Sequence, residues 1–566
     1  MITTKYIDSF DKNNPLSEYP RPQLVRNSYL SLNGSWNFKV SKQKDIYVSF
    51  DERIVVPYCM ESLLSGLNRK HDESEYLFYQ KTFTLDKDFL KDRVILHFDA
   101  IDQICKIYLN KKEICFNEFG YLPIILDITD YLNEDENEII VRVKDEINLD
   151  YPYGKQSNKP NGIWYTNVSG IWQSVWLEAV SNDYIKNIKI TPDIDNNKVN
   201  LQIDSLSDRF EIVIYDDGKE IYHETKNEKN IDIYLENPKY WSPEDPHLYY
   251  FDIKTKNDFV KSYFAMRKFS TNDKYFLLNN KPYFLNGLLD QGFFPDGIYT
   301  PASYEAYEND ILTMKSLGFN CLRKHIKIEP LRFYYFCDLY GMLVLQDIVN
   351  NGNYNFVLDT VLPNIGVTKK ILKFKNITDK QKEMFERAER KTIDYLYNVV
   401  SLCYYTIFNE AWGQHNADYY YQIAKEMDPT RVIDPTSGWI KENDSDVESL
   451  HIYFKKIKIK KANRPIIISE FGGYSYACLD HLYTDKNWGY RAYKTLKRFQ
   501  NGVNDLYLKQ IIPAIKNNNL AGCIYTQVSD VETEINGLFS YDRKVLKVDD
   551  SFKEVLKQLK EAFNND

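Results

Sequence analysis

The sequence has no long apolar run and no dense basic block. In its 566 residues nothing approaches the roughly 18 consecutive apolar residues of a membrane-spanning helix, so no membrane segment is expected. The formal net charge is −9, and the one strongly basic run, 455–461, is interrupted by Ile457 and Ile459. This alternation indicates one short basic face that is exposed to solvent, which is too small to bind along a phosphate backbone. We therefore expect no nucleic-acid partner.

The chain also lacks the marks of an exported, disulfide-linked or metal-binding protein. Its 8 cysteines form no C-x-x-C pair and do not cluster with histidines, and several stand inside apolar runs, as buried free thiols do. Residues 1–15 are polar and contain no apolar signal-peptide core. We therefore expect a cytoplasmic location, with no metal and no other cofactor. The cysteines within apolar runs include Cys105, Cys321, Cys403 and Cys523.

Three blocks of different periodicity follow one another along the chain. Up to about residue 180, short β-branched and aromatic runs are separated by Asn, Gly, Asp and Lys, which predicts an antiparallel sandwich. The next block alternates apolar and polar residues over the length of one immunoglobulin-like sandwich. The last block alternates apolar runs with helical patterns, which indicates a parallel sheet or barrel. The expected domains are 1–180, 181–272 and 273–566.

The last block contains eight apolar runs with helices between most of them, the strand count of a (β/α)8 barrel. Helices are expected at 303–317 and at 378–399, where Thr378 and Gln381 form a capping-box pattern. An insertion at 349–377 is long enough to wall a pocket. The expected strands are 284–289, 319–323, 342–346, 404–409, 431–434, 449–453, 465–469 and 522–526.

Two of these strands end in a glutamate, Glu410 after Asn409 and Glu470 after Ser469. The active site of a barrel forms at the C-terminal ends of its strands, so both carboxyl groups are expected at one mouth. Glycoside hydrolysis needs such a pair, one protonated to donate to the leaving oxygen and one ionised. The alternative is a structural ion-pair role, but the equivalent positions after two apolar runs favour catalysis.

Other polar and aromatic side chains follow the remaining strands. Arg323, if it lies near Glu470, would favour the ionised form of that carboxyl. The residues at or just after the strand ends are Asp290, Gln291, Arg323, His325, Asp347, Trp439, His451, Tyr453, Gln527 and Asp530.

These segments resemble glycoside hydrolase family 2, which contains β-galactosidases, β-glucuronidases and β-mannosidases. The resemblance extends over nearly the whole chain and includes NGIWYTNVSGIWQSVWLE (161–178), YYTIFNEAWGQ (404–414) and IIISEFGG (466–473). It implies an N-terminal β jelly-roll sugar-binding domain, an immunoglobulin-like β-sandwich and a C-terminal (β/α)8 TIM barrel. The other resembling segments are 19–38, 56–66, 119–132, 284–297, 317–325 and 525–544.

The resemblance also implies roles for individual residues. Glu410 would be the acid/base, and Glu470 the nucleophile that forms a covalent glycosyl-enzyme. Asn409 would bind the sugar 2-hydroxyl, Tyr453 would touch the nucleophile and Arg323 would support its charge. Barrel packing is the alternative role for His325, Asp347, Trp439 and His451, which are expected to shape the sugar site. A loop-fixing role is the alternative for Asp290 and Gln291, which are otherwise expected to contact sugar hydroxyls. Gln527 is also expected among the substrate-binding residues.

Three departures from the family pattern bear on the substrate. After the last barrel strand the family often has a Trp, whereas residues 525–527 read Tyr-Thr-Gln. β-Glucuronidases have an Asn-x-Lys motif whose Lys pairs with the substrate carboxylate, but residues 534–536 read Glu-Ile-Asn and lack this cation. Residues 347–356 offer one carboxylate where large β-galactosidases have a Mg-binding acidic cluster. A neutral sugar and no divalent metal are therefore expected.

The sequence thus predicts a retaining exo-β-glycosidase that hydrolyses a neutral β-glycoside, with a β-galactoside favoured. The alternatives are β-mannosidase or β-glucuronidase specificity, transglycosylation by the same residues, or a catalytically silent carbohydrate-binding relative. Retention of Glu410, Glu470, Asn409 and Tyr453 argues against the silent relative. The expected partners are an oligosaccharide or glycoside substrate and, through contacts of the sandwich domains, further copies of the chain in a homo-oligomer.

Overall fold

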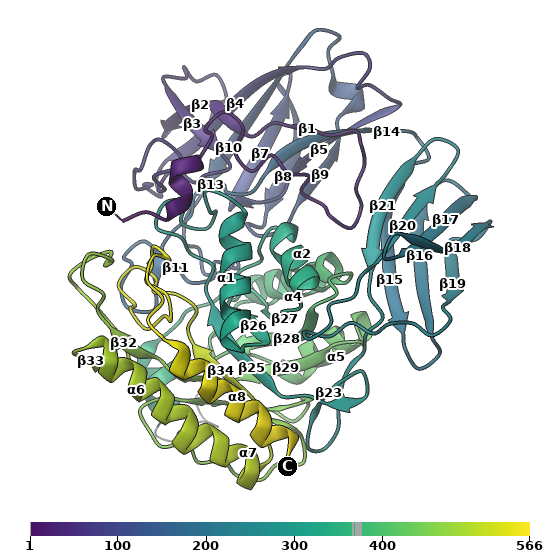
Figure 1. The fold of residues 1–566 in the computed structure, drawn as a ribbon. Coiled ribbons are helices and arrows are strands. Elements are labelled where there is room, and N and C mark those ends of the chain that lie inside the picture. Colours follow the sequence, from purple (N-terminus) through teal and green to yellow (C-terminus); the bar gives the residue numbers. More distant parts are fainter. Residues whose placement is uncertain (1, 365–366, 368–375, 566) are drawn as a thin grey trace.

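The computed structural model describes residues 2–364, 367 and 376–565, and it contains two β-sandwiches and a barrel (Figure 1). The first sandwich lies above the barrel in this view, and the second lies beside it. This architecture confirms the jelly-roll, immunoglobulin-like and (β/α)8 prediction. The predicted insertion at 349–377 falls partly outside the described residues. Among the described helices, none combines the length and apolar composition needed to cross a membrane.

The first sandwich packs a six-stranded sheet on a four-stranded sheet. Along β2 (Gly34–Ser41), Trp36 and Phe38 are buried, whereas Ser35 is exposed and Asn37 is half-buried, which is the alternation of a strand with one face in the core. The order of the larger sheet is β3 (Glu52–Val56), β2, β4 (Tyr76–Thr84), β10 (Glu136–Lys144), β7 (Ile104–Leu109), β8 (Lys112–Glu118). The order of the smaller sheet is β1 (Leu30–Ser31), β14 (Val175–Val180), β5 (Arg93–Phe98), β9 (Ile124–Asp127).

The second sandwich consists of a three-stranded and a four-stranded antiparallel sheet around a core of Ile, Leu, Val and Phe side chains. The smaller sheet is β15 (Ile185–Asp193), β16 (Lys198–Ser205), β19 (Asn230–Tyr234). The larger sheet is β18 (Lys219–Lys226), β17 (Phe210–Asp216), β20 (Tyr249–Lys254), β21 (Phe259–Phe264). A small sheet, β22 (Phe269–Thr271), β23 (Phe276–Leu278) and β24 (Lys281–Pro282), leads into the barrel.

The barrel is a parallel sheet of eight strands, and each overlaps one of the eight predicted from the sequence. The two end strands, β29 and β30, contact each other, so the ring is nearly closed. All eight are buried or nearly so, as expected of strands covered on both faces. In sheet order they are β29 (Val432–Ser437), β28 (Leu402–Asn409), β27 (Leu343–Asp347), β26 (Cys321–Lys324), β25 (Leu285–Asp290), β34 (Leu520–Thr526), β31 (Ile466–Gly472) and β30 (Glu448–Ile452).

Helices connect most of the barrel strands, and the predicted capping box of Thr378 and Gln381 begins α4. The fully described segments 438–447 and 453–465 contain no helix, so the chain enters and leaves β30 through loops. The helices are α1 (Glu305–Leu317), α2 (Leu331–Tyr340), α4 (Asp379–Leu396), α5 (Ala417–Met427), α6 (Leu496–Leu506), α7 (Ile512–Asn518) and α8 (Asp550–Asn564).

The predicted free cysteines are confirmed, because all eight are unpaired and only Cys115 is partly exposed.

A buried arginine joins the two sandwiches. Arg26 lies 3.1 Å from Glu178 on β14 and 2.8 Å from Asp258 at the turn before β21. Both carboxyl groups are almost fully buried, so the guanidinium compensates charges that water cannot reach.

We expect Arg26→Met to lower the free energy of unfolding by about 3–5 kcal/mol, because it leaves buried carboxylates without their shared cation. The urea midpoint of the first unfolding transition measures the loss. Arg209→Met is the matched control, because Arg209 is exposed on the second sandwich. Equal midpoints for the two variants would contradict the proposed role of Arg26.

Candidate active site

Arg323, at the end of β26, is the centre of a buried polar cluster at the barrel mouth. The guanidinium is 0% exposed and donates hydrogen bonds in four directions. The acceptors are Asp347 Oδ1 at 3.0 Å, Glu470 Oε1 at 3.1 Å, the Ser469 carbonyl at 3.0 Å and Asn409 Oδ1 at 3.0 Å. One side chain thus orients three of the predicted site residues, Asp347, Glu470 and Asn409.

Glu410 follows β28 in an unusual backbone conformation. Its φ is +51°, a left-handed region that costs a non-glycine residue about 1–3 kcal/mol and is commonest at functional sites. His451 Nδ1 lies 2.7 Å from Glu410 Oε1. Because Arg323 can only donate toward the other ring nitrogen, 3.4 Å away, the His451 proton lies on Nδ1 and is donated to Glu410. Burial lowers the pKa of His451 to about 4, so the ring is neutral at pH 7.

Glu470, at the end of β31, faces Glu410 across the same mouth. Tyr453 donates a hydrogen bond to Glu470 Oε2 at 2.8 Å, and the ring of Tyr453 stacks on that of Tyr490 with centroids 3.9 Å apart. One oxygen of Glu410, one oxygen of Glu470 and a nitrogen of His451 all lie within 4.8 Å of one another. The two carboxyl groups are therefore close enough for each charge to affect the other.

Burial dominates the ionisation of both carboxyl groups. It raises the pKa of Glu410 to about 7, against the lowering effects of Lys155 and Arg323. Burial also raises the pKa of Glu470, and the charge of Glu410 adds to this, whereas His451, Arg323 and Tyr453 lower it. Arg323 thus favours ionised Glu470, as the sequence indicated, but burial outweighs it. Like charges this close cannot both form readily, so the pair tends to keep one proton.

The other predicted residues divide into two groups. Asp347 joins the central cluster, where His325 Nδ1 lies 2.6 Å from its Oδ2 while Arg323 occupies its Oδ1. Burial lowers the pKa of His325 to about 3, so this ring is also neutral. Trp439 lies at the rim and donates to the His451 carbonyl at 3.3 Å.

Asp290 and Gln527 contact protein groups beside the cluster. Asp290 accepts from Lys324, 2.7 Å away, and from the Gly292 amide, which favours the loop-fixing alternative. Gln527 donates to Asn536 Oδ1 at 2.8 Å. Their contact with a sugar stays a prediction.

A cavity of about 470 Å³ opens beside Glu410, and much of its wall comes from residues that the sequence did not single out. Aromatic rings suit this position because they stack on the C–H faces of sugars. Trp164 belongs to the first sandwich, so the site is not built by the barrel alone. The aromatic lining residues are Trp164, Tyr354, Phe356, Trp439, Tyr453, Phe454, Trp488 and Tyr490.

Loops of the first sandwich are attached to the barrel around this cavity. The Gly162 and Thr166 amides donate to Thr533 Oγ1 at 3.0 Å and to Glu532 Oε1 at 2.9 Å. The Tyr165 hydroxyl donates to the Glu534 carboxylate. Residues 161–168 have no clear strand or helix periodicity, and their aromatic content was the one available signal that they line a site.

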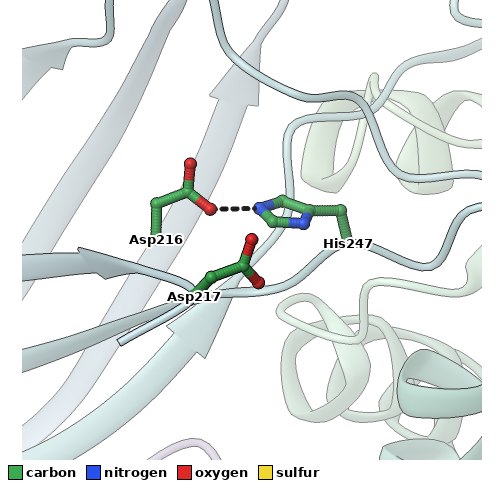
Figure 2. Close-up of side chains that lie close together, drawn as sticks. All are labelled: Asp216, Asp217 and His247. Carbon is green, nitrogen blue, oxygen red and sulfur yellow. Dashed lines mark ion pairs between the residues drawn. The ribbon is translucent and has the colours of Figure 1, made fainter. Parts of the chain in front are cut away.

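A second cluster of carboxylates and a histidine lies far from the barrel mouth (Figure 2). Asp216 ends β17 and Asp217 follows it, and His247 Nε2 lies 3.0 Å from Asp216 Oδ1. The Lys239 ammonium, not drawn in the figure, lies 3.0 Å from Asp216 and 2.8 Å from Asp217. A lysine thus already holds the place between the two carboxylates, and the cluster is explained as a surface ion pair.

A barrel with two buried glutamates at its strand ends is typical of glycoside hydrolases. Comparison with protein families agrees with this class. Residues 29–180 match the sugar-binding domain of glycosyl hydrolases family 2, residues 174–267 match glycosyl hydrolases family 2, and residues 269–561 match its TIM barrel domain. The chain belongs to glycosyl hydrolase family 2.

Individual relatives are distant. A β-galactosidase of Priestia megaterium is 23% identical over 69% of this chain, and one of Thermoanaerobacter pseudethanolicus is 24% identical over 79%. The chain spans 40% and 61% of the length of these two relatives. A solved β-glucuronidase from an uncultured Clostridium sp. superposes with a TM-score of 0.77 at 18% identity, covering 95% of this chain and 99% of that one.

Proposed function

We propose that the protein is a retaining exo-β-glycosidase in which Glu470 is the nucleophile and Glu410 the acid/base. The observation that supports this most directly is the closeness of the two carboxyl groups, an oxygen of each lying within 4.8 Å of the other. Inverting enzymes need room for a water molecule and separate their carboxyl groups by about 6.5–9.5 Å, whereas retaining enzymes bring them to about 5–5.5 Å.

In the first step a Glu470 oxygen attacks the anomeric carbon of the sugar, and the bond from that carbon to the leaving oxygen breaks. Glu410 gives its proton to the leaving oxygen. Arg323 and Tyr453 each hold one oxygen of Glu470, so the nucleophile is oriented before the sugar arrives. In the second step Glu410 takes a proton from water, the water oxygen bonds to the anomeric carbon, and the ester to Glu470 breaks.

The electrostatics give Glu410 the ionisation that its role requires, while Arg323 and Tyr453 favour the ionised form of Glu470 against its burial. A pKa of about 7 keeps a substantial share of Glu410 protonated near neutral pH. When Glu470 becomes an ester it loses its negative charge, so the pKa of Glu410 falls and the group can then act as a base. The complete set of Glu410, Glu470, Asn409 and Tyr453 favours this enzyme over a silent carbohydrate-binding relative.

The sugar is the less constrained part of the proposal. The relatives compared above are named β-galactosidases and β-glucuronidases, and the sequence favours a neutral β-galactoside because residues 534–536 lack a cation. Transfer to another sugar would use the same residues. A cytoplasmic location, which the eight free cysteines fit, and a homo-oligomer also stay proposals.

We expect Glu470→Ala to lower kcat on aryl β-glycosides by about 10⁴-fold or more, because it removes the covalent step. Glu410→Ala should lower kcat about 10²–10⁴-fold on glycosides with poor leaving groups. The loss should be far smaller on dinitrophenyl glycosides, because dinitrophenolate departs without being protonated. Steady-state kinetics with both leaving groups measure this difference. Equal losses on every substrate would contradict the assigned roles.

The sugar should be released initially as its β-anomer, because two displacements restore the starting configuration. Proton NMR of the anomeric signals in the first minutes of hydrolysis distinguishes it from the α-anomer before mutarotation mixes the two. Appearance of the α-anomer first would rule out the covalent mechanism.

Activity should fall as the pH is raised through about 7, because Glu410, with a pKa of about 7, then loses the proton that it must donate. The pH profile of kcat/KM measures this alkaline limb. In Glu410→Ala, assayed on a dinitrophenyl glycoside, the limb should disappear. Its persistence at the same pH would assign it to another group.

A further inference from the structure

We propose that Lys155, which the first sandwich contributes to the barrel mouth, binds the carboxylate of an acidic sugar, so that the site takes a β-uronide. This inference rests on the proposed glycosidase function and names the substrate class of that site. It reverses the neutral-sugar expectation, which depended on finding no cation at residues 534–536.

Lys155 is a largely buried side chain whose ammonium has no counter-ion among the described residues. The residue is 7% exposed, and its Nζ lies 5.4 Å from the ring centroid of Trp164, a lining residue of the cavity beside Glu410. Across residues 2–364, 367 and 376–565, no hydrogen-bond or ion-pair partner of this ammonium is found. An ammonium in so enclosed a position is only partly hydrated and has no protein counter-charge, so an anion that arrives with a ligand would be favoured beside it.

The segment that contains Lys155 is held firmly in place. The Tyr153 hydroxyl donates to the Gly352 carbonyl at 2.9 Å, which fixes the segment to the barrel. The Gln156 amide donates to Asp102 at 2.6 Å and to Tyr121 at 2.8 Å, which fixes it to its own sandwich. A charge presented on so rigid a segment loses little entropy when it binds a ligand.

The backbone before Lys155 packs tightly against the barrel loop that follows His325. Gly154 has a φ of +63°, and a Cβ there would lie 2.8 Å from the Ile326 carbonyl oxygen. A side chain at this position would both strain the backbone and push the loop away. The glycine therefore permits the close approach that brings Lys155 to the barrel mouth.

The charge of Lys155 affects the pKa of several groups at the barrel mouth. It opposes the burial that raises the pKa of Glu410 to about 7, and it adds to the burial that lowers the pKa of His325 to about 3. It also opposes the burial that raises the pKa of Glu534 to about 7. Lys155 therefore lies within electrostatic range of the acid/base and of two residues beside it.

Glu534 does not neutralise Lys155 by direct contact. One oxygen of Glu534 accepts from the Tyr165 hydroxyl, and the other accepts from Asn536 at 2.8 Å. With a pKa near 7, Glu534 is partly protonated at neutral pH, so its repulsion of an acidic sugar is weaker than its residue type indicates. The missing cation at residues 534–536 therefore does not by itself exclude a uronate, because Lys155 supplies a cation from another segment.

The ligand chemistry follows from the lysine itself. An ammonium offers three donors and no acceptor, and neutral sugar hydroxyls leave its charge uncompensated. A carboxylate supplies both the acceptor oxygens and the opposite charge. Exposed Lys456 and Lys458 line an adjoining cavity of about 540 Å³ together with Trp439 and Tyr453, so the approach to the site is also cationic.

The test compares wild-type enzyme with Lys155→Met and Lys155→Arg on four 4-nitrophenyl β-glycosides: the D-glucuronide, the D-galacturonide, the D-glucoside and the D-galactoside. Lys159→Met is the matched control, because Lys159 is exposed on the same loop. We expect the wild type to prefer one uronide over its neutral counterpart by about 100-fold or more. Lys155→Met should lower kcat/KM on that uronide about 100- to 1,000-fold, mainly through KM, and Lys155→Arg should retain part of it.

Two further measurements distinguish a ligand-binding role of Lys155 from a structural one. Lys155→Met should change kcat/KM on the neutral glycosides only a few-fold. It should not lower the thermal unfolding temperature, because the ammonium makes no ion pair or hydrogen bond among the described residues and Met keeps the apolar stem. Wild-type preference for a neutral glycoside would overturn the inference. Equal losses of kcat/KM on uronide and neutral substrates in Lys155→Met would also overturn it, whether or not the unfolding temperature is lowered.

The failure of the proposed function gives a different result. If the wild type cleaves none of the four glycosides, calorimetry with free D-glucuronate, D-galacturonate, D-glucose and D-galactose decides the role of Lys155. Binding of either acid that is lost in Lys155→Met would leave the inference standing and contradict only the glycosidase activity. Binding of neither acid to the wild type would overturn the inference.

Discussion

The buried guanidinium of Arg323 is the interaction on which the barrel mouth depends. Several acidic groups lie there away from water, and without a central cation their mutual repulsion and desolvation would be prohibitive. Arg323 donates to Asp347, Glu470 and Asn409 at 3.0–3.1 Å from strands on different sides of the ring. Because its donors lie in one plane, it fixes orientation as well as charge. Arg323 is therefore a positioning residue for Glu470 and for Asn409.

The first sandwich completes the site that the barrel begins. Trp164 lines the cavity, Tyr165 holds Glu534, and the charge of Lys155 opposes the burial that raises the pKa of Glu410. These contacts join residues that are hundreds of positions apart in the chain. The family model for residues 29–180 is described as a sugar-binding domain, and the contacts show how such a domain can shape a site on the neighbouring barrel.

Much of the fold and the centre of the site followed from the sequence, for identifiable physical reasons. Apolar runs of 4–8 residues mark buried parallel strands, so all eight were found, and the side chains after them necessarily share one mouth. Lys155 and Glu534 could not be found in the same way, since their roles depend on irregular loops and on long-range contacts. The raised pKa of Glu470 could not be predicted either, because it results from burial, which the sequence does not give.

The central claim is that Glu470 becomes covalently bonded to the sugar during turnover. A 2-deoxy-2-fluoro β-glycosyl fluoride of the sugar that the enzyme hydrolyses would test it, because the fluorine slows the second step and lets the ester accumulate. Mass spectrometry of the digested protein should find one fluorosugar on the peptide that contains Glu470. A label on Glu410, or an active enzyme that is never labelled, would contradict the account.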